Sequence, residues 1–323
     1  AGQGKRMQSP VPKVLQSLGD KPLLQHVVDT CSKIEKAKLH IIVGEQKKLI
    51  QSSISAPKST NWVIQKKQLG TGHAVKQVLP SLRANSQAVV LYGDGPLVKS
   101  STLKKLISNV AKNNLTLLTF ESANPKGLGR IIRQSNSKVS GIVEEKDASS
   151  SEKQIKEVNS GILATSTKNL KQWLPKLRNN NASKEYYLTD IVTLCSSENK
   201  SIKAINLGDT SELLGANDNQ ELHNLERIYQ KETALRFLKY GVKFADINRV
   251  DFRGEVSIGK NAFIDINVVL EGKVSIGSDS IISVGAVIRN STLSKKITVE
   301  PYSVIENSNI GDNSMIGRFE QIG

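Results

Sequence analysis

The sequence predicts an α/β domain with a mostly parallel sheet, followed by a parallel β-helix. Up to about residue 205, short apolar runs alternate with amphipathic segments and turn residues, which is the pattern of a sheet covered by helices. After residue 253 the apolar residues recur every six positions instead. A repeat of this length is typical of a coil of short parallel strands.

The α/β domain is predicted from apolar runs and helical spacing. Runs rich in branched residues predict buried strands at residues 39–43, 88–92, 115–120 and 161–164. Helical spacing predicts helices at residues 23–34, 71–79, 101–111 and 188–195, with Ser101 as the N-cap of the third. Ligands of such sheets bind beyond the carboxyl ends of the strands.

A linker and a coil follow this domain. A helical pattern over residues 216–240 stops at Gly241 and predicts a linker helix. The domains are therefore expected at residues 1–215 and 242–323, joined by residues 216–241.

The six-residue repeat is carried by apolar residues at inner positions, namely Ile258, Ile264, Leu270, Ile276, Ile282 and Ile288. Four positions after each comes a small or short-branched residue, as a tightly wound three-sided coil requires: Ala262, Val268, Val274, Ser280, Ala286 and Thr292. The repeat shifts by one residue at Leu293 and again at Ile310. Each coil buries its apolar residues only against neighbouring coils. Because the repeat is still running at Gly323, we expect a further segment or another element to cover this end.

Composition excludes several classes of protein. With 38% hydrophobic and 23% charged residues, the chain is not mainly disordered. Its longest apolar runs, such as residues 88–92, are far shorter than the roughly 20 residues of a membrane helix. The net charge of +15 comes from dispersed lysines, and aromatic residues make up only 4%, which disfavours nucleic-acid binding. Small polyanionic substrates, or solubility alone, explain the charge as well.

The two cysteines, Cys31 and Cys195, form neither a disulfide framework nor a zinc pattern. We therefore expect a reducing cytoplasm. No secretory signal opens the chain, and residues 1–4 read as a glycine turn that begins inside a motif.

Three segments have the residue types of a nucleotide site. In the first, the glycines of residues 1–4 let backbone N–H groups approach phosphates, while Arg6 and Lys13 add positive charge. In the second, Gln65 can donate and accept hydrogen bonds at once, as reading a uracil edge requires, and Gly70 permits close backbone approach. In the third, Asp94 directly follows the most apolar strand and offers oxygen to Mg²⁺. Taken singly, each segment could equally be a surface turn, a polar loop or a turn residue.

Together these segments resemble the signature of the sugar-1-phosphate nucleotidyltransferases. The similarity is closest to the bacterial N-acetylglucosamine-1-phosphate uridyltransferases and extends, in family order, over residues 65–74, 92–94, 127–131, 141–148, 158–162, 185–190 and 215–219. The resemblance implies a Rossmann-like α/β nucleotidyltransferase domain followed by a left-handed parallel β-helix of hexapeptide repeats.

The resemblance also implies a role for individual residues. Those expected to hold the uridine nucleotide are Ala1, Gly2, Gln65, Gly70 and Thr71, with Lys13 and Arg6 on its phosphates. Those expected on the sugar side are Tyr92, Gly93, Gly129, Glu144 and Asn159. Asp94 and Asn217 would ligate Mg²⁺, and Lys13, Arg6 and Asp94 would carry the catalysis.

The implied reaction joins UTP and N-acetylglucosamine-1-phosphate into UDP-N-acetylglucosamine and pyrophosphate, for cell-wall and lipopolysaccharide precursors. The resemblance further implies a homotrimer formed through the coil. Members of this group also acetylate glucosamine-1-phosphate from acetyl-CoA with a late histidine, and since no His follows His223, we expect that activity to be absent from these residues.

Two alternatives remain open. The first is a non-catalytic regulatory or scaffolding subunit of the same architecture, which the presence of Lys13, Asp94 and Asn217 disfavours. The second keeps the fold and changes the substrate, to glucose-1-phosphate or a thymidine nucleotide.

Some positions depart from the family pattern. The strand that normally precedes the glycine loop is absent, so the sheet is expected to lack one central member. Gln3 and Lys5 replace the usual Lys and Thr, and Gly95 replaces a branched residue. His73, at the start of a predicted helix, is expected to pack or to cap rather than to act on substrate.

Overall fold

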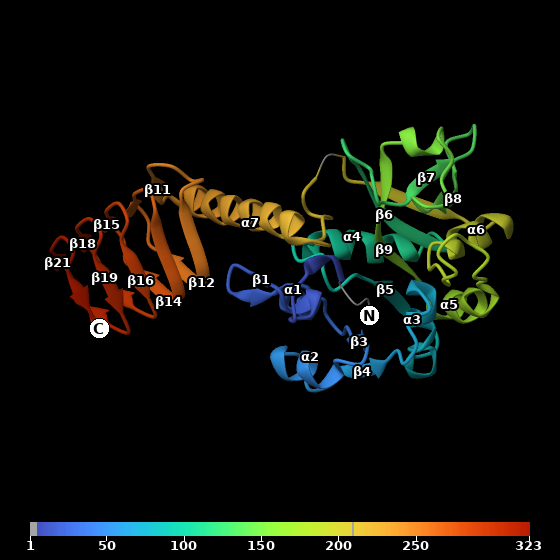
Figure 1. Cartoon of the computed structure of the whole chain (residues 1–323), viewed down its shortest axis with the longest axis horizontal. Helices are drawn as coiled ribbons and strands as arrows, with labels where there is room; N and C mark the ends of the chain where they lie inside the picture. The colour runs from blue at the N-terminus through green and yellow to red at the C-terminus, as the bar shows by residue number, and fades with distance from the viewer. Residues whose placement is uncertain (1–4, 209) are drawn as a thin grey trace. The chain divides into compact units, whose positions relative to one another are not determined.

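The computed structural model describes residues 5–208 and 210–323. The chain divides into two compact units, which are treated separately below (Figure 1). The first contains residues 1–16 and 23–217, and the second contains residues 17–22 and 218–323. Ala1 and Gly2, expected at the nucleotide, lie outside the described residues.

The first unit is built on a six-stranded sheet in the order β10-β6-β9-β7-β8, with β5 also paired to β9. Its strands are β5 (Gln87–Val90), β6 (Leu115–Glu121), β7 (Arg130–Arg133), β8 (Val139–Val143), β9 (Glu157–Ser166) and β10 (Ile202–Asn206). β6 and β10 are parallel, but β9 runs antiparallel to both β5 and β6. The sheet is therefore mixed rather than mostly parallel. The connection between β7 and β8 is short and allows only antiparallel pairing, since a parallel pair needs a long crossover.

A second, two-stranded parallel sheet is formed by β3 (His40–Val43) and β4 (Asn61–Ile64). Within residues 5–208, no strand pairs with the remaining edge of β3 or of β5. Apolar side chains of both strands, including Ile41 and Val89, line a cleft instead. These two separate sheets fit the expectation that one central strand is lacking.

Helices pack against both sheets. α1 (Leu23–Ser32) and α2 (Lys47–Ser53) share a core cluster with β3 and β4. α3 (Thr71–Lys76), α4 (Ser100–Val110), α5 (Thr167–Trp173) and α6 (Asp190–Ser197) pack into the core clusters of the larger sheet. Short 3₁₀ turns lie at Lys5–Met7 (η1), Lys13–Leu15 (η2), Leu79–Ser81 (η3), Glu152–Gln154 (η4) and Leu174–Lys176 (η5). Because side chains alternate along a strand, Leu117 of β6 packs into one core cluster and Leu118 into another.

The predicted N-cap of α4 is wrong. The helix begins at Ser100 with Lys99 as N-cap, so Ser101 already lies inside it. The Lys99 N–H donates to the carboxylate of buried Glu212 at 2.9 Å. A carboxylate from a distant segment thus supplies the negative charge that a helix N-terminus favours.

The second unit begins with the predicted linker helix, α7 (Asn219–Tyr240). Asp218 caps it by accepting from the Glu221 N–H at 2.9 Å. Gly241, with φ of +102°, ends it in the left-handed conformation that glycine adopts without strain. A hairpin of β1 (Ser17–Leu18) and β2 (Lys21–Pro22) belongs to this unit, and its Gly19 N–H donates to Glu226 of α7 at 2.9 Å.

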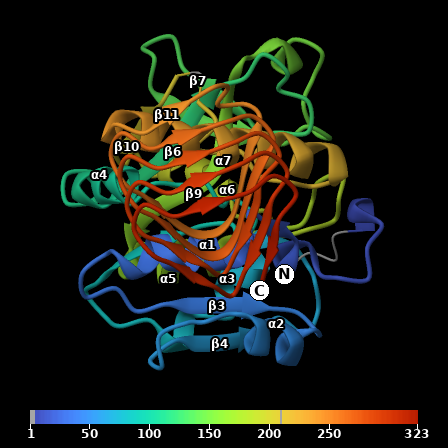
Figure 2. The ribbon, with the colours of Figure 1, turned by 90° about the vertical axis from the view of Figure 1, so that its left-hand side faces the viewer.

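Two ladders of parallel strands form the coil (Figure 2). The first ladder contains β11 (Lys243–Phe244), β13 (Phe263–Ile264), β15 (Ile281–Ile282), β18 (Thr298–Val299) and β21 (Met315–Ile316). The second contains β12 (Val250–Ile258), β14 (Val268–Ile276), β16 (Val287–Arg289), β17 (Thr292–Leu293), β19 (Val304–Glu306), β20 (Asn309–Ile310) and β22 (Gln321–Ile322). All six apolar residues of the first repeats are buried. The coil is therefore a parallel β-helix, as predicted.

The one-residue shift of the repeat has a structural consequence that the sequence analysis placed one residue too late. Thr292 is exposed, and Ser291 is the small residue that is buried, at 1% exposure. The coil shortens here, since Phe263 pairs with Ile281 whereas Ser275 pairs with Thr292. The buried Ser291 hydroxyl donates to the Arg289 carbonyl at 2.7 Å and accepts from the Ser308 N–H at 3.0 Å.

Residues with positive φ recur in rows at the bends of the coil. One row contains Asn261, Asp279, Lys296 and Asn313, and another contains Asn267, Gly285, Tyr302 and Phe319. Asn, Asp and Gly adopt this conformation most readily. The rings of Tyr302 and Phe319 stack with centroids 5.7 Å apart.

The position of the shift can be tested with neighbouring residues. Leu293→Ala removes a side chain that is 1% exposed and should destabilise the coil by about 2–5 kcal/mol. Thr292→Ala, on the exposed neighbour, should change stability by less than about 0.5 kcal/mol. Thermal unfolding followed by circular dichroism measures both, and equal effects would contradict the assigned inner position.

Candidate active site

Three side chains from distant parts of the first unit meet at one point. Lys13 lies in η2, Asp94 follows β5, and Asn217 is the last residue of the unit. The Lys13 Nζ forms an ion pair with the Asp94 carboxylate and donates to Asn217 Oδ1 at 2.9 Å. The Lys13 and Asp94 side chains are each 19% exposed. Lys13 and Asn217, which are 204 positions apart in the sequence, are therefore in direct contact.

Local geometry explains how Asn217 reaches Asp94. Asp94 lies beyond the carboxyl end of β5, where open α/β sheets hold their ligands. Gly215 passes so close that a Cβ atom there would lie 3.1 Å from the Asp94 carbonyl oxygen. Glycine at position 215 thus permits the close approach of the two segments.

The donor set of this point fits Mg²⁺. Asp94 offers carboxylate oxygen and Asn217 offers amide oxygen, and both already contact one cationic group. The described residues contain no cluster of three or more His, Cys, Asp or Glu with the spacing of a metal site. Mg²⁺ at nucleotide sites commonly takes only one or two protein ligands and completes its shell with phosphates and water. Two protein oxygens are therefore sufficient for a metal that arrives with a nucleotide.

Lys13, Asp94 and Asn217 line a cleft with a volume of about 1810 Å³. Every described residue that the sequence analysis assigned to nucleotide, phosphate, sugar or metal lines it. Arg6 is exposed and lies along it, together with Lys13. The predicted site residues thus occupy one continuous surface.

Gln65 lines the cleft and is 2% exposed. Its side-chain amide nitrogen donates to the Gly70 carbonyl at 3.1 Å and lies 3.0 Å from Nδ1 of His73. Gly70 has φ of +106°, and a Cβ atom there would lie 2.6 Å from the Tyr186 carbonyl oxygen. The Gln65 amide nitrogen is therefore in contact with two groups inside the protein.

Glu144 also lines the cleft. Its Oε1 accepts from the Thr189 hydroxyl at 2.8 Å, and a Cβ atom on Gly129 would lie 3.5 Å from its Oε2. Burial raises the pKa of the Glu144 carboxyl above its usual value, against the lowering effect of the Thr189 hydrogen bond. Thr189 thus holds one oxygen of the carboxylate while the other faces a glycine.

Asn159 and Tyr92 line the cleft as well. The Asn159 backbone N–H donates to the Gly129 carbonyl at 2.8 Å, and its Oδ1 accepts from the Gly161 N–H at 3.0 Å. The Tyr92 ring lies directly on Gly161, where a Cβ atom would come within 2.0 Å of the ring. Asn159 therefore has its side-chain oxygen engaged and its amide nitrogen available to donate.

Negative charge accumulates near Glu144. Asp190, the first residue of α6, has its pKa raised to about 6 by burial and by the carboxylates of Glu144 and Asp147. Crowded carboxyl groups with raised pKa values are typical of functional sites.

A buried arginine supports the loop that carries Gly129. Arg130 is 1% exposed, bonds the Leu128 carbonyl, and forms an ion pair with Glu145 at 2.6 Å. Glu145 also accepts from the Gly127 N–H at 3.1 Å. Glu145 thus contacts both Gly127 and Arg130 and holds the two ends of this short loop together.

The sequence analysis missed the supporting roles of Thr189, Asp190, Arg130 and Glu145, whereas His73 was already expected to pack or to cap. All five residues lie in segments quoted for the family resemblance. The local signal was a polar side chain adjacent to a predicted site residue. Sequence spacing alone does not say which atom it contacts.

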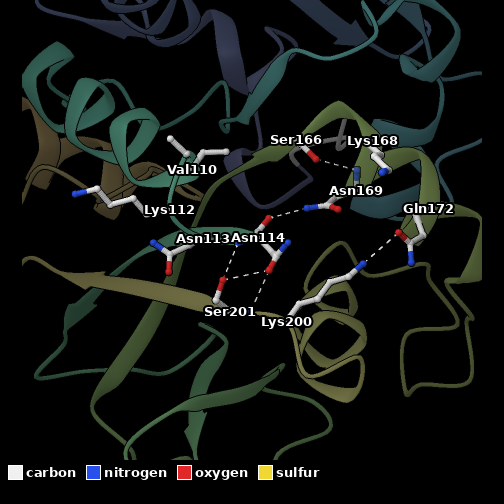
Figure 3. A pocket seen from close by; sticks show the side chains of 11 residues that line it. Val110, Lys112, Asn113, Asn114, Ser166, Lys168, Asn169, Gln172, Lys200 and Ser201 are labelled. Atoms are coloured by element: carbon white, nitrogen blue, oxygen red, sulfur yellow. Dashed lines mark hydrogen bonds between the residues drawn. The ribbon is translucent and has the colours of Figure 1, made fainter.

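A second cavity, of about 440 Å³, lies between the end of α4 and the start of α5 (Figure 3). Its polar side chains bond to one another: Asn169 donates to the Asn114 carbonyl at 2.9 Å, and Lys200 donates to Gln172 at 3.1 Å. Ser201 donates to the Asn114 side chain at 3.1 Å. This cavity holds none of the predicted site residues.

In residues 5–208 and 210–323, no helix combines the length and apolar character needed to cross a membrane.

The chain is similar to known protein families and to individual known proteins. The MobA-like NTP transferase domain matches residues 1–135, and the GMPPB C-terminal domain matches residues 252–323. The chain is 42% identical over 322 residues to the bifunctional protein GlmU of Marinobacter nauticus, covering 100% of this chain and 71% of that protein. It is 44% identical over 323 residues to the bifunctional protein GlmU of Nitrosomonas eutropha, covering 100% and 70%.

Two solved structures share the fold at low identity. An apo UDP-glucose pyrophosphorylase matches with a TM-score of 0.57 at 17% identity, over 72% of this chain and 96% of that chain. The inositol-1-phosphate CTP transferase from T. maritima matches with a TM-score of 0.54 at 15% identity, over 70% and 91%.

The identity to GlmU proteins extends over the whole of this chain and over more than two thirds of each relative. With a nucleotidyltransferase fold and a matching transferase domain, the chain belongs to the GlmU family and is a nucleotidyltransferase enzyme.

Proposed function

We propose that the enzyme transfers the uridylyl group of UTP to N-acetylglucosamine-1-phosphate, in a Mg²⁺-dependent reaction that releases pyrophosphate. The observation that carries this proposal is the meeting of Lys13, Asp94 and Asn217 in one cleft. Gln65 and Glu144 line the same cleft. The product, UDP-N-acetylglucosamine, would supply cell-wall and lipopolysaccharide precursors in the cytoplasm.

The chemistry requires positioning more than proton transfer. The attacking phosphate oxygen is already ionised at neutral pH, so no general base is needed. The barrier lies in holding two polyanions together and in stabilising the charge that develops at the α-phosphorus. Lys13 and Arg6 supply fixed positive charge at the cleft.

Asp94 and Asn217 are the residues that would hold Mg²⁺. The bound ion would neutralise phosphate oxygens of the nucleotide. In the structure described here the Lys13 ammonium takes the place between these two oxygens. If Asp94 and Asn217 held the metal instead, Lys13 would be free to contact the phosphates.

The sugar end is suited to a neutral, hydroxyl-rich ligand. Glu144 can accept from a sugar hydroxyl through Oε2, because Oε1 is held by Thr189. The Asn159 amide can donate, because its oxygen is engaged by Gly161. A site with such fixed polar groups discriminates strongly against ligands that leave them unpaired.

We also propose that the β-helix is left-handed and that the protein is a homotrimer formed through it. Ile281 and Met315, on outward positions of one ladder with Thr298 between them, are 46% and 70% exposed. Exposed apolar side chains on one face favour association of identical subunits.

The substrate assignment is tested with a panel of sugar phosphates. Pyrophosphate release with UTP should be fastest with N-acetylglucosamine-1-phosphate and at least about tenfold slower with glucose-1-phosphate, which lacks the acetamido group. Equal rates with the two sugars would refute the assignment, and release with neither would refute the reaction.

The metal assignment is tested by Asp94→Ala. Turnover should fall by about 10³-fold or more, because one of the two protein ligands is lost. The melting temperature should shift by only a few degrees, since the ion pair with Lys13 is partly solvated. Glu121→Ala, which removes an exposed carboxylate that bonds Asn206, is the control and should keep full activity. Near-normal turnover of Asp94→Ala at limiting Mg²⁺ would contradict the assignment.

The crowded carboxylates predict a pH-dependent gain in stability for Asp190→Asn. The pKa of Asp190 is raised from 3.8 to about 6, so the folded state binds its proton more tightly than the unfolded state. Its ionisation therefore costs stability as pH rises through this window, by at most about 3 kcal/mol and by less for a half-buried group. Asp190→Asn should raise the melting temperature at pH 8 and leave it unchanged at pH 3.5. A gain of equal size at both pH values would contradict the electrostatic cause.

A further inference from the structure

His73 contacts Gln65, the residue proposed to read the nucleobase. Its Nδ1 lies 3.0 Å from the Gln65 amide nitrogen, and its Nε2 lies 3.2 Å from the amide nitrogen of Gln77. The imidazole is half-buried, with the Tyr186 ring at a centroid distance of 6.4 Å. The ring is thus enclosed between two glutamine side chains.

The orientation of the Gln65 amide follows from its two neighbours. One amide hydrogen points at the Gly70 carbonyl oxygen, so a flipped amide would set two oxygens against each other. The other hydrogen points at His73 Nδ1, which can accept it only while that nitrogen carries no proton. The ring proton must then sit on Nε2. The Gln77 amide nitrogen faces Nε2 and also donates to the His73 carbonyl oxygen at 3.1 Å. Because Gln65 is 2% exposed and Gln77 is more exposed, Gln77 rather than Gln65 is expected to move its amide away from the Nε2–H group.

We propose that His73 is a positioning residue that sets nucleobase selectivity, an inference that rests on the uridylyl transfer proposed above. As an Nε2–H tautomer it holds Gln65 so that Oε1 alone faces the cleft. Within the described part of the chain, no hydrogen bond to Oε1 is found.

The chemical consequence is a preference for uracil over cytosine. Uracil carries a donor, N3–H, where cytosine carries an acceptor, N3. A fixed oxygen accepts from the first and repels the second, so the base with the wrong pattern leaves buried polar groups unpaired. Without His73, one Gln65 hydrogen loses its partner and the amide can turn its nitrogen toward the base.

The test compares the binding of UTP and CTP by calorimetry, in the presence of Mg²⁺, in the full chain and three variants. His73→Phe removes the acceptor and should reduce the preference for UTP by about tenfold. His73→Asn, whose Oδ1 can stand in for Nδ1, should retain most of the preference. Gln77→Ala removes the contact to the other ring nitrogen and a hydrogen bond to the His73 carbonyl, and it should leave the preference unchanged because neither contact involves Nδ1. Affinity for N-acetylglucosamine-1-phosphate should be the same in all four proteins.

The outcomes separate the two proposals. If the parent protein prefers UTP and His73→Phe keeps that preference in full, the role of His73 is wrong while uridylyl transfer stands. Loss of preference in His73→Asn equal to that in His73→Phe would also overturn it. If the parent protein binds neither nucleotide, both the proposed function and this inference are wrong.

The tautomer itself provides a second measurement that does not depend on the variants folding. The ring ¹⁵N chemical shifts of His73 in the parent protein should show a protonated Nε2 and an unprotonated Nδ1 at neutral pH. A protonated Nδ1 would overturn the proposal, because Gln65 could then no longer donate to it.

Discussion

The contact of the Lys13 ammonium with Asp94 and Asn217 is the interaction on which the site depends. It joins the start of the first unit, the end of β5 and the end of the unit at one point. The lysine ammonium thus holds a carboxylate oxygen and an amide oxygen close to one point. If these groups bind metal and phosphate as proposed, their convergence before binding would reduce the reorganisation that binding requires.

Most of the coarse fold could be predicted from the sequence because it depends on periodicity. The strands at 40–43 and 115–121 and the helix at 219–240 agree with prediction within a few residues, and the six-residue repeat predicted the coil. The details that failed depend on partners distant in the sequence. The cap of α4 is a carboxylate more than a hundred residues away, at Glu212. The antiparallel course of β9 depends on a hairpin, β7–β8, that lacks a strong turn signal and was not predicted.

The same distinction applies to the site. Lys13, Asp94 and Asn217 could be assigned through family resemblance, and the structure brings them together. The atoms that orient these and the other site residues could not be, because a sequence motif gives a residue type and not the direction of a hydrogen bond. Gln65 is the clearest case, since its amide can donate and accept in principle but its nitrogen contacts two groups inside the protein here. Thr189 is another, because only coordinates show that its hydroxyl reaches Glu144.

One short segment contacts both the loop after Gln65 and Glu144. The Tyr186 carbonyl accepts from the Gly72 N–H at 2.8 Å, and the Leu188 N–H donates to the Thr71 hydroxyl at 3.0 Å, so the loop after Gln65 is held from this side. One residue later, the Thr189 hydroxyl donates to Glu144. Because residues 186–189 are a single stretch of backbone, a displacement of this segment would move the loop after Gln65 and the Glu144 carboxylate together. If Gln65 and Glu144 bind base and sugar as proposed, this segment would also constrain the distance between the two reactants.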